Sequence, residues 1–296
     1  MIKIEKGSKV AVVAPSAQIG EISKIGKGLK YLESIGLIPV LGKNLLCTNR
    51  YMAGSDTQRA DDINSAFSDS DIKAIFCVRA AAGATRILPY IDYKLAQKNP
   101  KPVIGFCDNV ALQLALNKLS GITCLNGFSL TYDFKNDTPD KAICADLEQQ
   151  LAGNLPVFTS GKTLHNGLAE GQLLCANLSV LIRLAGTPYF PDLSGKILLI
   201  EDVHERLHKI DLMLQQLKQQ QSFHNLKAVI FGQFTDCAGD EEDGTLFDCF
   251  KDFLQNTNIP AVIDFNFGHT PSRHVLPLGS LARLNADSST LEILSD

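Results

Sequence analysis

A cysteine stands where an apolar strand is predicted to turn into a helix, in the segment VIGFCDNVALQLAL. The strand ends at Gly105 and the helix covers 110–119, which places Cys107 in the turn between them. A side chain there projects from the carboxyl edge of a parallel sheet, where open α/β proteins bind their ligands. The positive end of the following helix would favour the thiolate, and the backbone N–H of Asp108 could face a developing oxyanion.

Two further segments place polar side chains directly after predicted strands. KILLIEDV ends in the carboxylates Glu201 and Asp202, and FNFGHTPSR holds His269 in a loop. Each residue also has an ordinary interpretation, because cysteines after strands often only pack, acids often cap helices and loop histidines are often exposed. Together, a nucleophile, an acid and a histidine fit an activated nucleophile whose base is oriented by a third group.

The elements that would position these residues alternate along the first half of the chain. Apolar β-branched runs and stretches with helical spacing follow one another, which is typical of βαβ units around a parallel sheet. We predict strands over 9–14, 74–78 and 102–105, and helices over 22–35, 57–67 and 110–119.

The length of 296 residues favours two domains that share one cleft. Near 151–171 the sequence becomes rich in turn-forming residues, so we predict a nucleophile domain over 1–150, a linker over 151–170 and a second domain over 171–296. In that second domain the pattern predicts helices over 178–185, 210–219 and 246–255, and strands over 196–200, 228–232 and 261–265.

Composition excludes several classes of function. A net charge of -4 provides no basic surface for nucleic acid or anionic lipid. The eight cysteines are scattered without a CxxC pair, so we expect no metal cluster and no disulfide framework, and Cys77 in AIFCV should be an inert buried thiol. No signal-peptide pattern and no run of about 18 apolar residues occurs, so we expect a cytoplasmic protein outside the membrane.

A zinc-protease pattern, HExxH, runs from His204 through Glu205 to His208. On one helix the two histidines could bind zinc, with the glutamate as general base. The preceding strand leaves little helix before His204, and no third ligand follows in the usual pattern. We therefore favour a metal-independent reaction without a cofactor, and interpret the acidic stretch 236–244 as a solvated loop.

Six ordered landmarks resemble the LD-carboxypeptidases, a family of murein tetrapeptide carboxypeptidases and microcin-immunity peptidases. They are VAVVAPS, AGSDTQRADDINSAFSDSDIKAIFCVR, GATRILPYIDY, KPVIGFCD, GTPYFPDLSGKILLIEDVHE and FGHTPSRHVLPLGSLARL. The resemblance implies a flavodoxin-like N-terminal domain with a parallel sheet, and a C-terminal α/β domain with a small β-structure. It also implies an active site between the domains and a homodimer.

The resemblance also implies roles for individual residues. Cys107 takes the place of the family's serine nucleophile, Glu201 that of the acid and His269 that of the base. Backbone amides at Ala81 and Asp108 match the oxyanion donors.

This sequence departs from the family around the oxyanion loop. Ala80, Ala81 and Ala82 stand where the family has two glycines and an aromatic residue, and Gly83 is kept. Since glycine permits positive φ and close approach, these alanines could re-aim the oxyanion amide.

Two more residues are candidates for substrate binding. Arg79 would either pair with a substrate carboxylate or stabilise its own loop, and Asn177 matches a family GGN stretch.

The activity that the resemblance implies is hydrolysis of an amide to a small terminal residue. The expected substrate is a muropeptide or small peptide-like molecule, with D-alanine removed from a murein tetrapeptide during cell-wall recycling. Two alternatives stay open, an immunity-type peptidase acting on aminoacyl-nucleotide amides and a catalytically impaired muropeptide binder.

Overall fold

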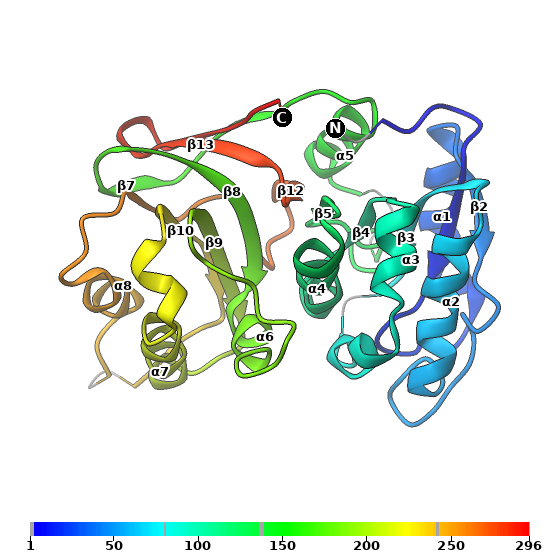
Figure 1. Cartoon of the computed structure of the whole chain (residues 1–296), viewed down its shortest axis with the longest axis horizontal. Coiled ribbons are helices and arrows are strands. Elements are labelled where there is room, and N and C mark those ends of the chain that lie inside the picture. The colour runs from blue at the N-terminus through cyan, green and yellow to red at the C-terminus, as the bar shows by residue number, and fades with distance from the viewer. Residues whose placement is uncertain (1–2, 80, 136–138, 241–242, 296) are drawn as a thin grey trace. The chain divides into compact units, whose positions relative to one another are not determined.

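The computed structural model describes residues 3–79, 81–135, 139–240 and 243–295. The chain folds into two compact units, and each is built on one β-sheet with helices packed against it (Figure 1). Unit 1 comprises Met1–Asn154, Thr187–Pro191 and Val275–Gly279, and unit 2 comprises Leu155–Gly186, Asp192–His274 and Ser280–Asp296. The predicted α/β class is confirmed.

Unit 1 has a six-stranded sheet in the order β12-β5-β4-β3-β1-β2. Neighbouring strands run parallel except for β12, which pairs antiparallel with β5. The strands are β1 (Lys9–Val13), β2 (Ile38–Leu41), β3 (Ile72–Cys77), β4 (Val103–Gly105), β5 (Cys124–Asn126) and β12 (Leu276–Leu278). Because β1, β3, β4 and β5 run the same way, the loops that follow them meet at one edge of the sheet.

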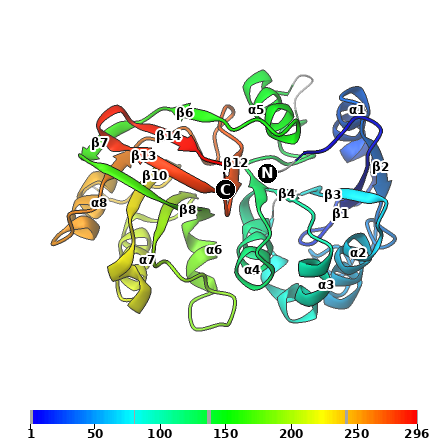
Figure 2. The same ribbon diagram turned by 45° about the horizontal axis from the view of Figure 1, so that its top comes forward.

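Helices cover both faces of this sheet (Figure 2). One face carries α1 (Gly26–Ser34) and α5 (Lys141–Leu151), and the other carries α2 (Asp56–Ser68), α3 (Tyr93–Lys98) and α4 (Val110–Ser120). Short 3-10 turns connect these elements: η1 (Ile22–Ile25), η2 (Ala84–Tyr90) and η3 (Cys107–Asn109).

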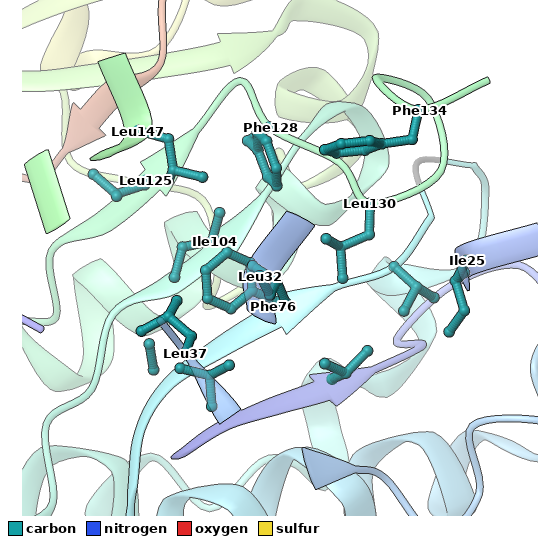
Figure 3. Close-up of a cluster of buried hydrophobic side chains, with 14 of the residues drawn as sticks. Ile25, Leu32, Leu37, Phe76, Ile104, Leu125, Phe128, Leu130, Phe134 and Leu147 are labelled. Carbon is teal, nitrogen blue, oxygen red and sulfur yellow. The ribbon is translucent and has the colours of Figure 1, made fainter. Parts of the chain in front are cut away.

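A buried apolar cluster fills the space between the sheet and the α1 and α5 face (Figure 3). Alternate strand residues such as Phe76 and Ile104 meet Leu32 of α1 and Leu147 of α5 there, and all are inaccessible to solvent. Fully burying one such side chain stabilises the fold by about 1.5–3 kcal/mol. This core therefore fixes the strand ends from which the candidate site projects.

Unit 2 has an eight-stranded sheet in the order β6-β14-β13-β8-β9-β10-β11-β7. The central strands β8, β9, β10 and β11 are parallel, and the outer strands join them antiparallel. The strands are β6 (Val157–Thr159), β7 (Lys162–His165), β8 (Leu168–Asn177), β9 (Lys196–Val203), β10 (Ala228–Thr235), β11 (Ala261–Ile263), β13 (Leu281–Asn285) and β14 (Thr290–Ile293).

Three helices of unit 2 lie side by side along this sheet (Figure 1). They are α6 (Leu178–Arg183), α7 (Leu207–Lys218) and α8 (Leu246–Leu254), and the 3-10 turns are η4 (Gln221–Asn225) and η6 (Ala286–Ser288). Within the described ranges, no helix combines the length and the apolar character needed to cross a bilayer.

Every strand and helix that the pattern predicts is confirmed, with ends displaced by a few residues. Other elements were missed, namely the helices α3 and α5 and the strands β2, β5, β6, β7, β8, β12, β13 and β14. For β5, β6 and β12 the reason is length, because three residues are too few to show a period of two. The predicted helix over 22–35 is a 3-10 turn followed by α1.

The segment 151–170, predicted as a linker, carries strands of unit 2. β6, β7 and the start of β8 fall in this range and pair with β14, β11 and β13. Gly161 and Gly167 adopt positive φ between these short strands, and such closely spaced turn residues concealed the alternation. The chain also returns to unit 1 twice, at Thr187–Pro191 and Val275–Gly279.

Candidate active site

Cys107 occupies a strained turn between β4 and α4. Phe106 is extended, with φ -150° and ψ 161°, and Cys107 follows in the left-handed region with φ 57°. A residue other than glycine in that region costs on the order of 1 kcal/mol or more, and such residues cluster at functional sites. A nucleophile on a sharp strand-to-helix turn is the arrangement of the nucleophile elbow. The Cys107 side chain is half-buried, so it is open to solvent on one side.

The loop after β3 is tied to this turn. The carbonyl of Arg79 accepts hydrogen bonds from Asn109 Nδ2 and from Ser16 Oγ, each at 3.0 Å. Further along the loop, the amide of Ala84 donates to Asp108 Oδ2 at 2.6 Å. The loops after β1, β3 and β4 are therefore held in one arrangement by buried polar side chains.

Ala81 lies within this tied loop and is half-buried, and Ala82 is exposed. Among the described residues, no acceptor is found for the amide of Ala81. Ala80, also named as a departure from the family, lies outside the described residues. The Asp108 carboxylate accepts a hydrogen bond from the loop, at the amide of Ala84. The backbone amide of Asp108 is the second candidate donor to an oxyanion.

Gly83 ends the loop in a conformation that favours glycine, with φ 141°. The buried guanidinium of Arg59 donates through Nη1 to the carbonyls of Gly83 at 2.8 Å and of Pro15 at 2.6 Å, and Nη2 contacts Asp56. A Cβ at Gly83 would lie 3.1 Å from Arg59 Nη1. The one glycine kept from the family loop is the one that this packing requires.

Arg79 is exposed, and its Nη1 donates to the carbonyl of Gln18. Two roles were expected for Arg79, pairing with a substrate carboxylate and stabilising its own loop. The contact with Gln18 corresponds to the second role. Ser16, Arg59 and Asn109 were missed as positioning residues, although two lie in the quoted landmarks VAVVAPS and AGSDTQRADD.

In unit 2, Glu201 and His269 are in contact. Glu201 Oε2 lies 2.8 Å from Nδ1 of His269, and their side chains are 1% and 11% exposed. Since a carboxylate only accepts hydrogen bonds, Nδ1 carries the proton and Nε2 of the neutral imidazole keeps its lone pair. The pair brings together two residues 68 positions apart, and a neutral imidazole in this arrangement can act as a base through Nε2.

The strand that carries Glu201 is longer than predicted. β9 runs to Val203 because it keeps pairing with β10 up to Thr235, so Glu201 and Asp202 lie within the strand and not after it. Gly268 lets the loop that carries His269 lie close to β10. Its φ is 140°, and a Cβ at this position would lie only 2.9 Å from the carbonyl of Gln233.

Asn177 and Asp202 form a buried network beside this pair. Asn177 caps α6 by accepting from Val180 N, and its Nδ2 donates to Asp202 Oδ1 at 3.0 Å. The amide of Ser179 donates to Asp202 Oδ2 at 2.8 Å. Both polar groups of Asn177, a predicted substrate-binding residue, are therefore engaged within the protein, and Asp202 supports the start of α6.

Burial raises the pKa of Asp202 to about 6, and the nearby Glu201 carboxylate adds to the effect. Hydrogen bonds from Val203, Ser179 and Asn177 act in the opposite direction. A second thiol is close: burial raises the pKa of Cys237 to about 11, and the carboxylates of Asp202 and Glu201 contribute. That thiol stays protonated at neutral pH and is a poor nucleophile.

The confirmed burial of Cys77 likewise raises the pKa of its thiol.

The HExxH residues do not share a helix. His204 follows β9 with φ 56°, and α7 begins only at Leu207, so His204 and His208 do not form the paired face that a zinc protease needs. His204 is 75% exposed and faces Asp236 at 3.7 Å. Within the described ranges, no three His, Cys, Asp or Glu side chains gather as metal ligands.

Replacing Gly268 with alanine should disrupt the Glu201–His269 pair. The new Cβ would press on Gln233 in a backbone conformation that costs a residue other than glycine about 1–3 kcal/mol. We expect urea unfolding to show a loss of that size, and the imidazole N–H resonance of the bonded His269 to disappear. Gly26→Ala is the control, since φ is -57° and no atom lies within 4 Å. Equal behaviour of the two variants would contradict this account.

Asp202→Asn should remove a pH-dependent contribution to the free energy of unfolding. Because the folded pKa is about 6 and the ordinary value 3.8, the folded state keeps a proton that the unfolded chain releases, and wild-type stability falls as pH rises between them. We expect the unfolding free energy of wild type minus variant to drop by up to about 3 kcal/mol from pH 4 to 7. Asp248→Asn should show the opposite sign, since bonds from Thr245 lower the pKa of Asp248. A flat difference for Asp202→Asn would rule out the raised pKa.

Comparison with known proteins agrees over both units. Residues 10–127 match the LD-carboxypeptidase N-terminal domain, and residues 170–284 match the LD-carboxypeptidase C-terminal domain. The murein tetrapeptide carboxypeptidase of Pseudomonas aeruginosa is 30% identical, with 94% of each chain covered.

Solved structures show the same fold. The muramoyltetrapeptide carboxypeptidase from Oxalobacter formigenes is 25% identical with a TM-score of 0.88, covering 97% of this chain and 99% of its own. A microcin self-immunity protein in complex with aspartyl sulfamoyl adenosine has a TM-score of 0.89 at 20% identity, covering 100% and 98%. With both domain models matched in order and relatives covered almost from end to end, the chain belongs to the LD-carboxypeptidase family and is a carboxypeptidase.

Proposed function

We propose that the protein removes the terminal D-alanine from murein tetrapeptides, with Cys107 in the position of the family serine. The observation that carries this proposal is the buried Glu201–His269 pair, because it supplies a general base with a defined tautomer. The strained turn at Cys107 supports the assignment of the nucleophile. The name of the Oxalobacter formigenes relative supports the choice of substrate.

The reaction follows from these groups. Nε2 of His269 takes the Cys107 proton as the sulfur attacks the carbonyl carbon of the residue before D-alanine, while Glu201 stabilises the imidazolium. The imidazolium then gives this proton to the departing amine of D-alanine, which leaves a thioester on Cys107. Water activated by His269 hydrolyses the thioester and regenerates the thiol.

The oxyanion formed in each step would be held by the backbone amides of Ala81 and Asp108. Both residues belong to segments that the hydrogen bonds of Asn109 and Ser16 fix, and this supports the assignment. One such donor contributes on the order of 3 kcal/mol to transition-state stabilisation. We propose that Ala81 and Ala82 narrow the site without removing the donor.

We also propose that the protein works in cell-wall recycling, as a cytoplasmic homodimer. The eight cysteines support a reducing compartment, because all are free thiols. An immunity-type peptidase acting on aminoacyl-nucleotide amides is the second candidate, favoured by the 25% identity to a microcin self-immunity protein of Escherichia coli.

Cys107→Ala should abolish release of D-alanine from a murein tetrapeptide. We expect kcat to fall at least about a thousandfold, since the covalent step is lost. A coupled D-alanine assay and mass spectrometry of the tripeptide product measure this. Cys47→Ala, which removes a half-buried thiol away from the Cys107 turn, is the matched control and should keep full activity.

The same assay separates the alternatives. Undiminished turnover in Cys107→Ala would exclude the sulfur from the reaction, and activity only in Cys107→Ser would mark the natural form as a binder. Cleavage of an aminoacyl sulfamoyl nucleoside in place of the tetrapeptide would favour the immunity-type activity.

A further inference from the structure

Unit 1 contains a cavity of about 560 Å³ next to the Cys107 turn. Three segments line it: the loop and turn after β1, Arg79 after β3, and residues 131–135 after β5. In the sheet, β4 lies between β3 and β5, so the cavity opens at the same carboxyl edge as the nucleophile. Its volume is in the range of small-molecule sites.

The lining is cationic. Lys24, Lys27, Arg79 and Lys135 belong to the lining, and none of the described lining residues is acidic. Lys24, Arg79 and Lys135 form no ion pair within the part of the chain that the structure describes. Gathering like charges around one cavity costs free energy that a bound anion would recover.

The cavity is joined to the reacting turn through two of its residues. The ring of Tyr132 packs against Phe106, the residue before Cys107, with centroids 6.2 Å apart. Arg79 lines the cavity with its side chain, and its carbonyl is held by Asn109 of the nucleophile turn. A group bound here would therefore lie beside the segment that carries Cys107.

We propose that this cavity, the cationic pocket, is a subsite for a polyanionic part of the substrate, carrying at least two carboxylates or a phosphate. The assignment of its role as a subsite rests on the proposed function. The ammonium groups and the guanidinium supply charge-assisted hydrogen bonds. The buried side chains of Ile19 and Phe134, the latter drawn in the apolar cluster of Figure 3, provide an apolar floor for the carbon skeleton of the ligand.

The side chains of Arg79 and Lys135 are already oriented by contacts within the protein. Arg79 Nη1 donates to the carbonyl of Gln18, which fixes the side chain and leaves further N–H donors on the guanidinium. The Lys135 ammonium lies 4.5 Å from the centre of the Tyr132 ring, a cation–π contact that orients it without neutralising its charge.

The test uses two murein tetrapeptides that differ only in whether the carboxylates beside the scissile residue are free or amidated. We expect wild type to favour the free-acid substrate by about tenfold or more in kcat/KM. Lys24→Gln, Arg79→Gln and Lys135→Gln should each raise KM for it about three- to tenfold with little change in kcat, and the triple variant should lose the preference. Lys30→Gln, an exposed lysine of α1 outside the lining, should behave as wild type.

Calorimetry makes the proposal testable without turnover. Pyrophosphate and tricarballylate should bind wild type and lose affinity at least about tenfold in the triple variant, with binding weakened by salt. Tighter tricarballylate binding would identify peptide carboxylates as the source of the anion, and tighter pyrophosphate binding a nucleotide-linked substrate. Retained substrate preference, or equal affinity of wild type and triple variant, would overturn the proposal while leaving the hydrolase intact.

If wild type releases no D-alanine from either tetrapeptide yet binds these anions through the pocket, the proposed function fails and the site stands.

Discussion

The hydrogen bond between the buried carboxylate of Glu201 and His269 is the constraint on which unit 2 depends. A carboxylate that is 1% exposed is costly to hold without a partner, and the imidazole N–H supplies one. For this hydrogen bond to form, the loop that carries His269 must pack closely against β9 and β10. Gly268 allows this close packing, because it adopts a positive φ and has no side chain. The neighbouring Asp202 is satisfied separately by Asn177 and Ser179, so that Glu201 stays dedicated to the histidine.

Unit 1 meets a different constraint, the left-handed backbone of Cys107. A strained backbone conformation persists only where contacts with the surrounding structure stabilise it by more than the strain costs. Here Asn109 and Ser16 hold the carbonyl of Arg79, and Asp108 holds the amide of Ala84. The same bonds that stabilise the Cys107 turn also position the loop containing Ala81, so one network fixes both the proposed nucleophile and the proposed oxyanion donor. Arg59 closes it from the other end through Gly83.

A thiol at the position of the family's serine would change what the rest of the proposed site has to do. A thiolate is a better nucleophile than an alcohol, and a thiol is the more acidic group, so in the proposed reaction His269 would remove its proton more easily. Burial raises the pKa of the Cys77 and Cys237 thiols, which keeps them protonated at neutral pH. The cationic pocket adds a positive field at the carboxyl edge of the sheet, which would attract an anionic substrate toward the proposed nucleophile.

By itself the sequence determined the α/β class, part of the core strands and helices and the candidate residues, because apolar periodicity and turn residues act over short distances. It also carried the family landmarks around Cys107, Glu201 and His269. It did not reveal the central strand β8 or the helix α5, which covers the core of unit 1. Only the tertiary structure decided that residues 151–170 are strands of unit 2, and that Asn177 spends both polar groups on α6 and Asp202. It alone showed the 2.8 Å Glu201–His269 contact, the strain at Cys107 and the clustering of Lys24, Arg79 and Lys135. These depend on packing between segments far apart in the chain, and no local pattern encodes such distances.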